Sequence, residues 1–136
     1  MRDTQLSYID PDTHFKVHFM ASEVLNHSTA QTWQMFVEDL QGDKWMEDDE
    51  LDRGETALRN MRTRTLEAYK DVDTPLQRRH NEKVFAVVDW TMALVVKKRE
   101  AINTTKIRQL DIDGYTPHEI VSFGHNRELV EAVLGG

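Results

Sequence analysis

The feature that most constrains the fold is an apolar run at residues 84–96, in which only Asp89 and Thr91 are polar. Apolar residues adjoin one another throughout the run, so it lacks the strict alternation of a half-buried strand. A helix that is apolar on every side must be enclosed by other elements. Thirteen residues are too few for a bilayer span, which needs about 20. We therefore expect no membrane association. The run is the centre of a helical domain, or a helix shared between subunits of a homo-oligomer.

The residues that flank the run predict where its helix begins and ends. Thr74 is suited to the N-cap, Pro75 to the first helical position, and Gln77 to closing a capping box. Cations at 97–99 lie toward the far end, where they favour the carbonyl end of the helix dipole. We expect one helix over about 75–103, roughly 43 Å long at 1.5 Å per residue.

Three further helices are expected before this one. Asp12 or Thr13 begins a helix that runs to about Leu25, although the alternation of Phe15, Val17 and Phe19 with polar residues also allows a strand. We favour the helix, because no other segment offers an obvious strand partner. A capping box at 28–31 opens a helix to about residue 41, and another helix covers about 55–70.

The resulting fold class is all-α. A helical body spans residues 1–105 around the long central helix, and a small subdomain follows at 106–136. The first twelve residues are expected to form a polar arm.

The composition excludes some classes of functional site. The chain has no cysteine, which excludes disulfides, thiolate zinc sites and a cysteine nucleophile. No apolar signal segment follows the N-terminus, so we expect cytoplasmic localisation. The net charge of −7 is carried by residues 38–55, and the rest of the chain has fifteen acids and fifteen bases. The overall acidity therefore does not argue against nucleic-acid binding elsewhere.

Residues 106–134 form a cluster of short elements. The first runs from Ile107 to Asp113 and stops at Gly114. Thr116-Pro117-His118-Glu119 is a capping box that starts the second, Gly124 makes a turn, and Asn126–Leu134 is the third. Two short helices that cross steeply need a small turn residue and aliphatic residues on their facing sides. This segment resembles the helix-turn-helix of regulators, resolvases and small phage DNA-binding subunits.

The resemblance implies a non-enzymatic DNA-binding or DNA-associated accessory protein, a transcriptional regulator or a small phage packaging-type subunit. His125, Asn126 and Arg127 are the implied base contacts, because the start of the third helix points into the major groove. Lys97, Lys98 and Arg99 are candidate phosphate contacts, as are the cations at 59–64 and 78–83. The alternative is a helical hairpin that only packs or binds protein, since residues 104–136 hold three bases and five acids.

The acidic stretch suggests a different function. Trp45 and Met46 lie beside Asp48, Asp49 and Glu50, and an aromatic residue on a charged loop is a common interface anchor. The competing hypothesis is therefore a protein-binding adaptor or inhibitor. It would use this stretch or the C-terminal hairpin against a partner with a basic surface.

Residue patterns for catalysis or metal binding are weak. The stretch from Asp48 resembles a calcium loop, but Arg53 occupies the position that requires glycine. His14 and His18 have the i, i+4 spacing of a metal pair on a helix, without a third ligand. Asp89 is expected to pair with a cation or to lie at a subunit seam. We expect neither an enzyme nor a cofactor.

Overall fold

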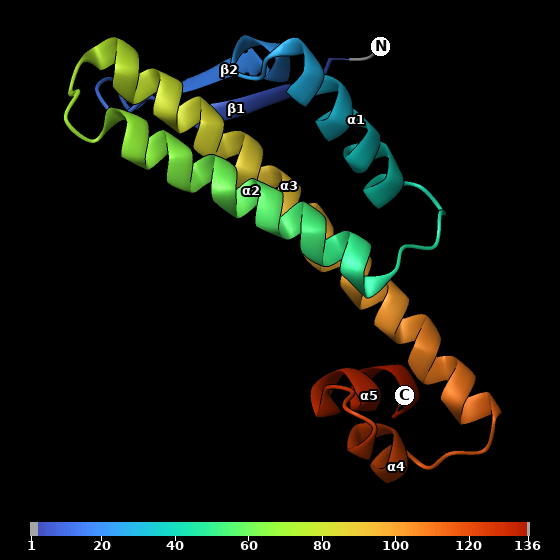
Figure 1. Ribbon diagram of the computed structural model, residues 1–136. Coiled ribbons are helices and arrows are strands. Elements are labelled where there is room, and N and C mark those ends of the chain that lie inside the picture. Colours follow the sequence, from blue (N-terminus) through green and yellow to red (C-terminus); the bar gives the residue numbers. More distant parts are fainter. Residues whose placement is uncertain (1–2, 136) are drawn as a thin grey trace. The chain divides into compact units, whose positions relative to one another are not determined.

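The computed structural model describes residues 3–135, a mostly helical chain with one small sheet (Figure 1). Its elements are β1 (Gln5–Ile9), β2 (Lys16–Met20), the 3-10 turn η1 (Ala21–Glu23), α1 (His27–Gln41), α2 (Asp48–Tyr69), α3 (Pro75–Ile112), α4 (Pro117–Ser122) and α5 (Arg127–Leu134). The expected predominance of helix is confirmed. None of the helices in this range is long and apolar enough to cross a bilayer.

Contacts divide the chain into two compact units. The N-terminal unit is Met1–Val95 and the C-terminal unit is Val96–Gly136. The division falls inside α3, which contributes its first part to one unit and its remainder to the other.

The helix expected from Asp12 to Leu25 is wrong, because this segment contains the second strand of a β-hairpin, followed by η1. β2 pairs antiparallel with β1, from Gln5 opposite Met20 to Ile9 opposite Lys16. The partner strand is the segment expected as a polar arm. The alternation of apolar and polar residues therefore did indicate a strand, and its partner strand lies a few residues upstream.

The hairpin turn is organised by the carboxylate of Asp10. It accepts backbone hydrogen bonds from Asp12 at 2.8 Å and from Thr13 at 3.1 Å. These two bonds, together with the positive charges of Arg79 and His14, lower the pKa of Asp10 despite the opposing effect of burial. His14 follows with a φ of 63°, in the left-handed region.

α1 begins slightly earlier than expected. Its N-cap is Asn26, whose side chain accepts from the backbone N–H of Thr29 at 2.9 Å, so the cap predicted at Ser28 is wrong. The apolar face of α1 is buried at Trp33, Val37 and Leu40.

α2 begins seven residues before its predicted start at Glu55. Asp48, Asp49 and Glu50 occupy its first turn, where carboxylates stabilise the positive end of the helix dipole. Gly54 lies inside this helix, and glycine is needed there because the ring of Phe36 on α1 occupies the space of a side chain.

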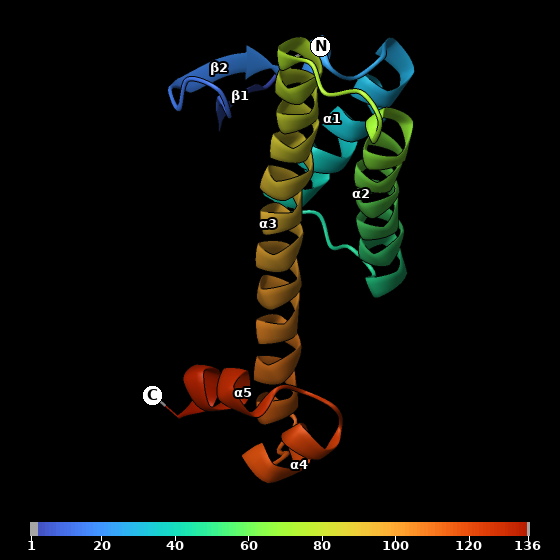
Figure 2. The same ribbon diagram turned by 90° about the vertical axis from the view of Figure 1, so that its left-hand side faces the viewer.

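α3 confirms the central helix and extends it to Ile112 (Figure 2). Thr74 caps its start as predicted, accepting from the backbone N–H of Gln77 at 3.1 Å. The predicted end near residue 103 is wrong, because Gly114 is the first helix breaker after Pro75. The separate helix expected from Ile107 to Asp113 is the end of α3.

The apolar run on α3 is not enclosed on every side. Val84, Val87, Val88, Thr91 and Val95 are buried, whereas Asp89, Ala93 and Val96 are exposed. The expected ion pair of Asp89 is confirmed, with Arg62 of α2 at 3.2 Å. Its expected burial is wrong, so this carboxylate carries little desolvation cost.

The core of the N-terminal unit joins the hairpin, α1 and α3. Its buried residues are Leu6, Tyr8, Phe19, Ala21, Leu25, Trp33, Val37 and Val87. The even-numbered residues of β1 face this core, and Tyr8 meets Phe19 edge to face at 5.8 Å between ring centroids.

Candidate nucleic-acid interface

The C-terminal unit is built around three aliphatic side chains. Ile107 of α3, Ile120 of α4 and Val130 of α5 are fully buried together, with partly buried aliphatic residues around them. Each helix thus supplies one central residue to a shared small core. The close packing expected between the second and third short helices is present.

The start of α4 is determined by local hydrogen bonds. The hydroxyl of Thr116 accepts from the backbone N–H of Glu119 at 3.2 Å, and the Glu119 carboxylate accepts from the backbone N–H of Thr116 at 3.1 Å. The predicted capping box is confirmed. The same backbone bond is the main cause of a lowered pKa at Glu119.

The turn from α4 to α5 depends on Gly124, whose φ is +104°. No atom lies within 4 Å of the position of an added Cβ, so the need for glycine comes from the backbone angle alone. Asn126 then caps α5 by accepting from the backbone N–H of Leu129 at 3.0 Å.

The predicted base-contacting residues lie at the start of α5. Arg127 and Asn126 are exposed and His125 is half-buried. The side-chain oxygen of Asn126 is engaged in the cap, which leaves its amide hydrogens as donors. Arg127 also borders a cleft of about 190 Å³ between α4 and α5, together with His118 and Glu131.

The structure distributes the predicted phosphate contacts around α3. Lys97 is exposed, Arg99 is half-buried, and Lys98 is only 9% exposed. Consecutive residues of a helix point in different directions, so three adjacent cations cannot share a face.

Arg108 is a candidate that the sequence analysis missed. It lines a shallow hollow of about 400 Å³ along α3 with Lys97, Ala101 and Thr104. Their spacing of four, seven and eleven residues from Lys97 was the signal that could have identified this face.

The other basic groups, at 59–64 and 78–83, lie in the N-terminal unit, and four of their six cations pair with acids. Arg59 pairs with Glu55 at 2.8 Å within α2. Arg62 pairs with Asp89 and also lies 5.1 Å from the ring centroid of Phe85.

The remaining basic pairs involve the start of α3. Arg78 bonds Asp12 and Asp73, and Lys83 lies 3.3 Å from Glu23.

The residues of the predicted protein interface differ in exposure, and some of them are engaged in contacts within the chain. Trp45 is 46% exposed and its indole N–H donates to Glu47 at 3.1 Å, whereas Met46 is buried. Asp49 pairs with Arg53 and Glu50 with Lys44, both at 3.6 Å.

The structure does not provide the helix on which the proposed histidine metal pair depended. His14 lies in the hairpin turn and His18 on β2, so the two do not share a helix face. Within residues 3–135, no group of three or more potential ligands is arranged to hold a metal ion.

Comparisons with known protein families, curated proteins and solved structures find no match to this chain. Proposals about its function therefore depend on the geometry of its own residues.

Proposed function

We propose that this protein is a non-enzymatic DNA-associated accessory protein whose α4–α5 pair acts as a helix-turn-helix on duplex DNA. The observation that carries the proposal is the turn between these helices. Two short helices share a core at Ile120 and Val130, and Gly124 adopts the positive φ that the turn requires. This is the local geometry that such a motif needs.

In this proposal the beginning of α5 reads the base edges. Arg127 is exposed in the first turn, and an arginine there can donate two hydrogen bonds to guanine. His125 precedes it. Asn126 orders the start of the helix through its cap and offers only its amide hydrogens to DNA.

Phosphate contacts are assigned to Lys97 and Arg108, which share the exposed hollow on α3. These two phosphate contacts per chain imply that log K falls with log salt at a slope of about −1.8. The six acids and six bases of residues 96–135 cancel, and the net charge of −7 belongs to the N-terminal unit. Binding is therefore expected to be weak.

A second function is favoured by exposed apolar residues on the same unit. Ile112 is 75% exposed, and Tyr115 and Phe123 form an exposed edge-to-face pair at 5.1 Å. Exposed aromatic residues are common anchors of protein interfaces. The alternative is thus a protein-binding adaptor that uses this hairpin, or Trp45 on the other unit.

Fluorescence anisotropy with mixed-sequence duplex DNA at 50 and 200 mM salt tests the proposal. We expect binding at the lower salt concentration that weakens steeply at the higher one and is reduced about tenfold or more in Arg127→Ala. Arg53→Ala is the matched control, because Arg53 is exposed on α2 and pairs only within its own helix. Absence of binding at low salt, or equal effects of the two substitutions, would refute DNA recognition by α5.

A further inference from the structure

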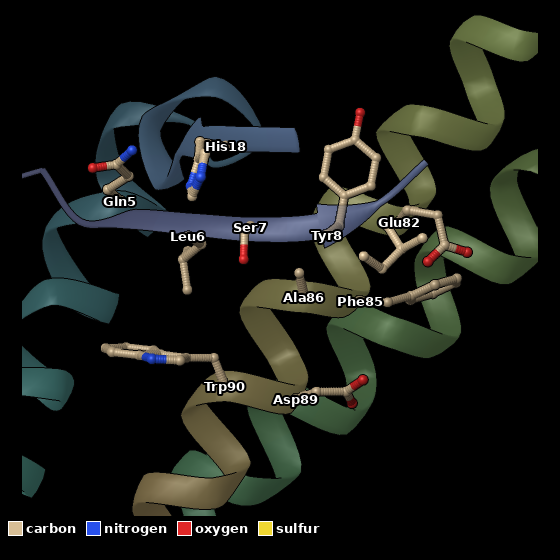
Figure 3. A pocket seen from close by; sticks show the side chains of 11 residues that line it. Gln5, Leu6, Ser7, Tyr8, His18, Glu82, Phe85, Ala86, Asp89 and Trp90 are labelled. Atoms are coloured by element: carbon tan, nitrogen blue, oxygen red, sulfur yellow. The ribbon is translucent and has the colours of Figure 1, made fainter. Parts of the chain in front are cut away.

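A hollow in the N-terminal unit follows the outer edge of β1. It encloses about 700 Å³ and is bordered by β1 on one side and by α3 on the other. Figure 3 shows Leu6 pointing from the strand to the side on which Ala86 and Trp90 of the helix lie, whereas the ring of Tyr8 points away from them. The hollow therefore lies between an open strand edge and a helix surface that carries apolar side chains together with the carboxylates of Glu82 and Asp89.

The pairing with β2 shows which backbone groups of β1 point into this space. Ala21 donates to Thr4, and Asp10 donates to Phe15, each at 2.9 Å, so the even-numbered residues of β1 bond toward β2. Antiparallel pairs alternate along a strand. The N–H and C=O groups of Gln5, Ser7 and Ile9 therefore point away from β2, and within residues 3–135 the sheet has no third strand to receive them.

The two edges of the sheet are protected unequally. On β2 the outer edge carries the charge of Lys16, and the backbone N–H of Met20 already donates to the Glu23 carboxylate at 2.6 Å. Charged residues and occupied backbone groups are the usual means of preventing edge pairing. Gln5, Ser7 and Ile9 are uncharged and include no proline. The edge of β1 is therefore left able to accept a strand.

We propose that the edge of β1 pairs antiparallel with β1 of a second copy of this chain, about a two-fold axis at Ser7. Ser7 then faces its own counterpart, and Gln5 faces Ile9 of the second copy. All three outward residues form hydrogen-bonded pairs, about six backbone bonds in total. A two-fold interface requires such a self-complementary patch.

Side chains and charges agree with a second copy as the occupant. In this register Leu6 lies opposite Tyr8 of the second copy, so the apolar face of one hairpin continues into the other. β1 contains no charged residue, so no like charges face each other between the two paired strands. The strand order becomes β2–β1–β1–β2, and the product is a four-stranded sheet closed by the protected β2 edges.

This inference concerns the N-terminal unit and does not depend on the proposed DNA binding. Because the chain has no cysteine, single-cysteine variants report the pairing directly. Ser7→Cys places two thiols at a facing pair, about 5.5 Å between Cα atoms, which is within disulfide range. We expect Ser7→Cys to form a covalent dimer on oxidation, and His18→Cys on the outer edge of β2 to remain monomeric on a non-reducing gel.

The register has its own test. Gln5→Cys or Ile9→Cys alone leaves the two thiols about 14 Å apart, at roughly 3.4 Å per residue. Neither variant should cross-link alone, and an equimolar mixture of the two should. Cross-linking of either one alone, at the level of the mixture, would overturn the register.

Light scattering on the unmodified chain completes the experiment. We expect about twice the chain mass of 15.9 kDa. Ser7→Pro removes an outward N–H and should give monomers with the circular dichroism of the parent, whereas the matched His18→Pro should remain dimeric. A monomeric parent chain, a dimer that persists in Ser7→Pro, or equal cross-linking of Ser7→Cys and His18→Cys would overturn the proposal. If the parent chain is monomeric, the remaining candidate to pair with the β1 edge is a strand from another protein.

Discussion

The buried hydrogen bond between α1 and α3 should be a major determinant of the stability of the N-terminal unit. Thr91 is fully buried, and its hydroxyl accepts from the indole N–H of Trp33 at 2.9 Å. The same hydroxyl donates to the carbonyl of Val87 at 2.6 Å. The Trp33 N–H has this partner only while the hydroxyl is present, whereas the Val87 carbonyl also accepts the helical N–H of residue 91.

Thr91→Val tests this arrangement because valine has nearly the same shape and no hydroxyl. The substitution leaves the buried Trp33 N–H without an acceptor, which costs about 1–3 kcal/mol. We expect a loss of about 2 kcal/mol in the free energy of unfolding. At an m-value of about 2 kcal/mol/M in urea, the midpoint should fall by about 1 M with an unchanged slope.

Thr91→Ser is the matched control. Serine keeps the hydroxyl and loses one methyl group, a change worth about 1 kcal/mol in a core. Urea unfolding followed by circular dichroism should therefore place stability in the order parent, Thr91→Ser, Thr91→Val.

A Thr91→Val variant as stable as Thr91→Ser, or more stable, would refute the reasoning. A double-mutant cycle with Trp33→Phe sharpens the result, because removing both partners leaves no unpaired indole donor. The double variant should lose less stability than the sum of the two single variants.

Two further perturbations are predicted. Gly124→Ala should destabilise the C-terminal unit by about 1–2 kcal/mol, because the backbone φ at this position is +104°. The measurement is the rate of proteolysis between α4 and α5, which should increase. An unchanged rate would contradict the need for glycine there. The pKa of Asp10 is lower in the folded chain than in the unfolded chain, where it is about 3.9. The ionised carboxylate therefore contributes its full stabilisation of the fold above about pH 3.9, and this contribution is lost as the pH falls through the pKa of the folded chain. Asp10→Asn should flatten the acid side of the stability profile, and an equally steep acid transition would assign it to other carboxylates.

Much of the helical structure could be predicted from local patterns. Thr74 before Pro75 located the start of α3, and the capping box of Thr116 and Glu119 located the start of α4. These signals are local because a cap is formed by residues three positions apart. Gly124 likewise marked its turn, since few residues other than glycine adopt a positive φ there.

Tertiary contacts decided the elements that were predicted incorrectly. β2 exists because β1 lies beside it, and a strand is stable only with a partner, which a pattern in one segment does not reveal. Position 54 of α2 needs glycine because the Phe36 ring of α1 occupies the space of a side chain there, a contact that the pattern of α2 alone does not reveal.

The candidate site shows the same limit. The sequence alone determined that the cations at 97–99 lie on a helix and that Arg127 lies at the start of another. Only the tertiary structure decided that Lys98 is buried and that the helix face shared by Lys97 and Arg108 is exposed. Burial depends on which face of a helix its neighbours cover. That is a property of packing between segments distant in the chain, whereas caps and turns depend on residues adjacent in it.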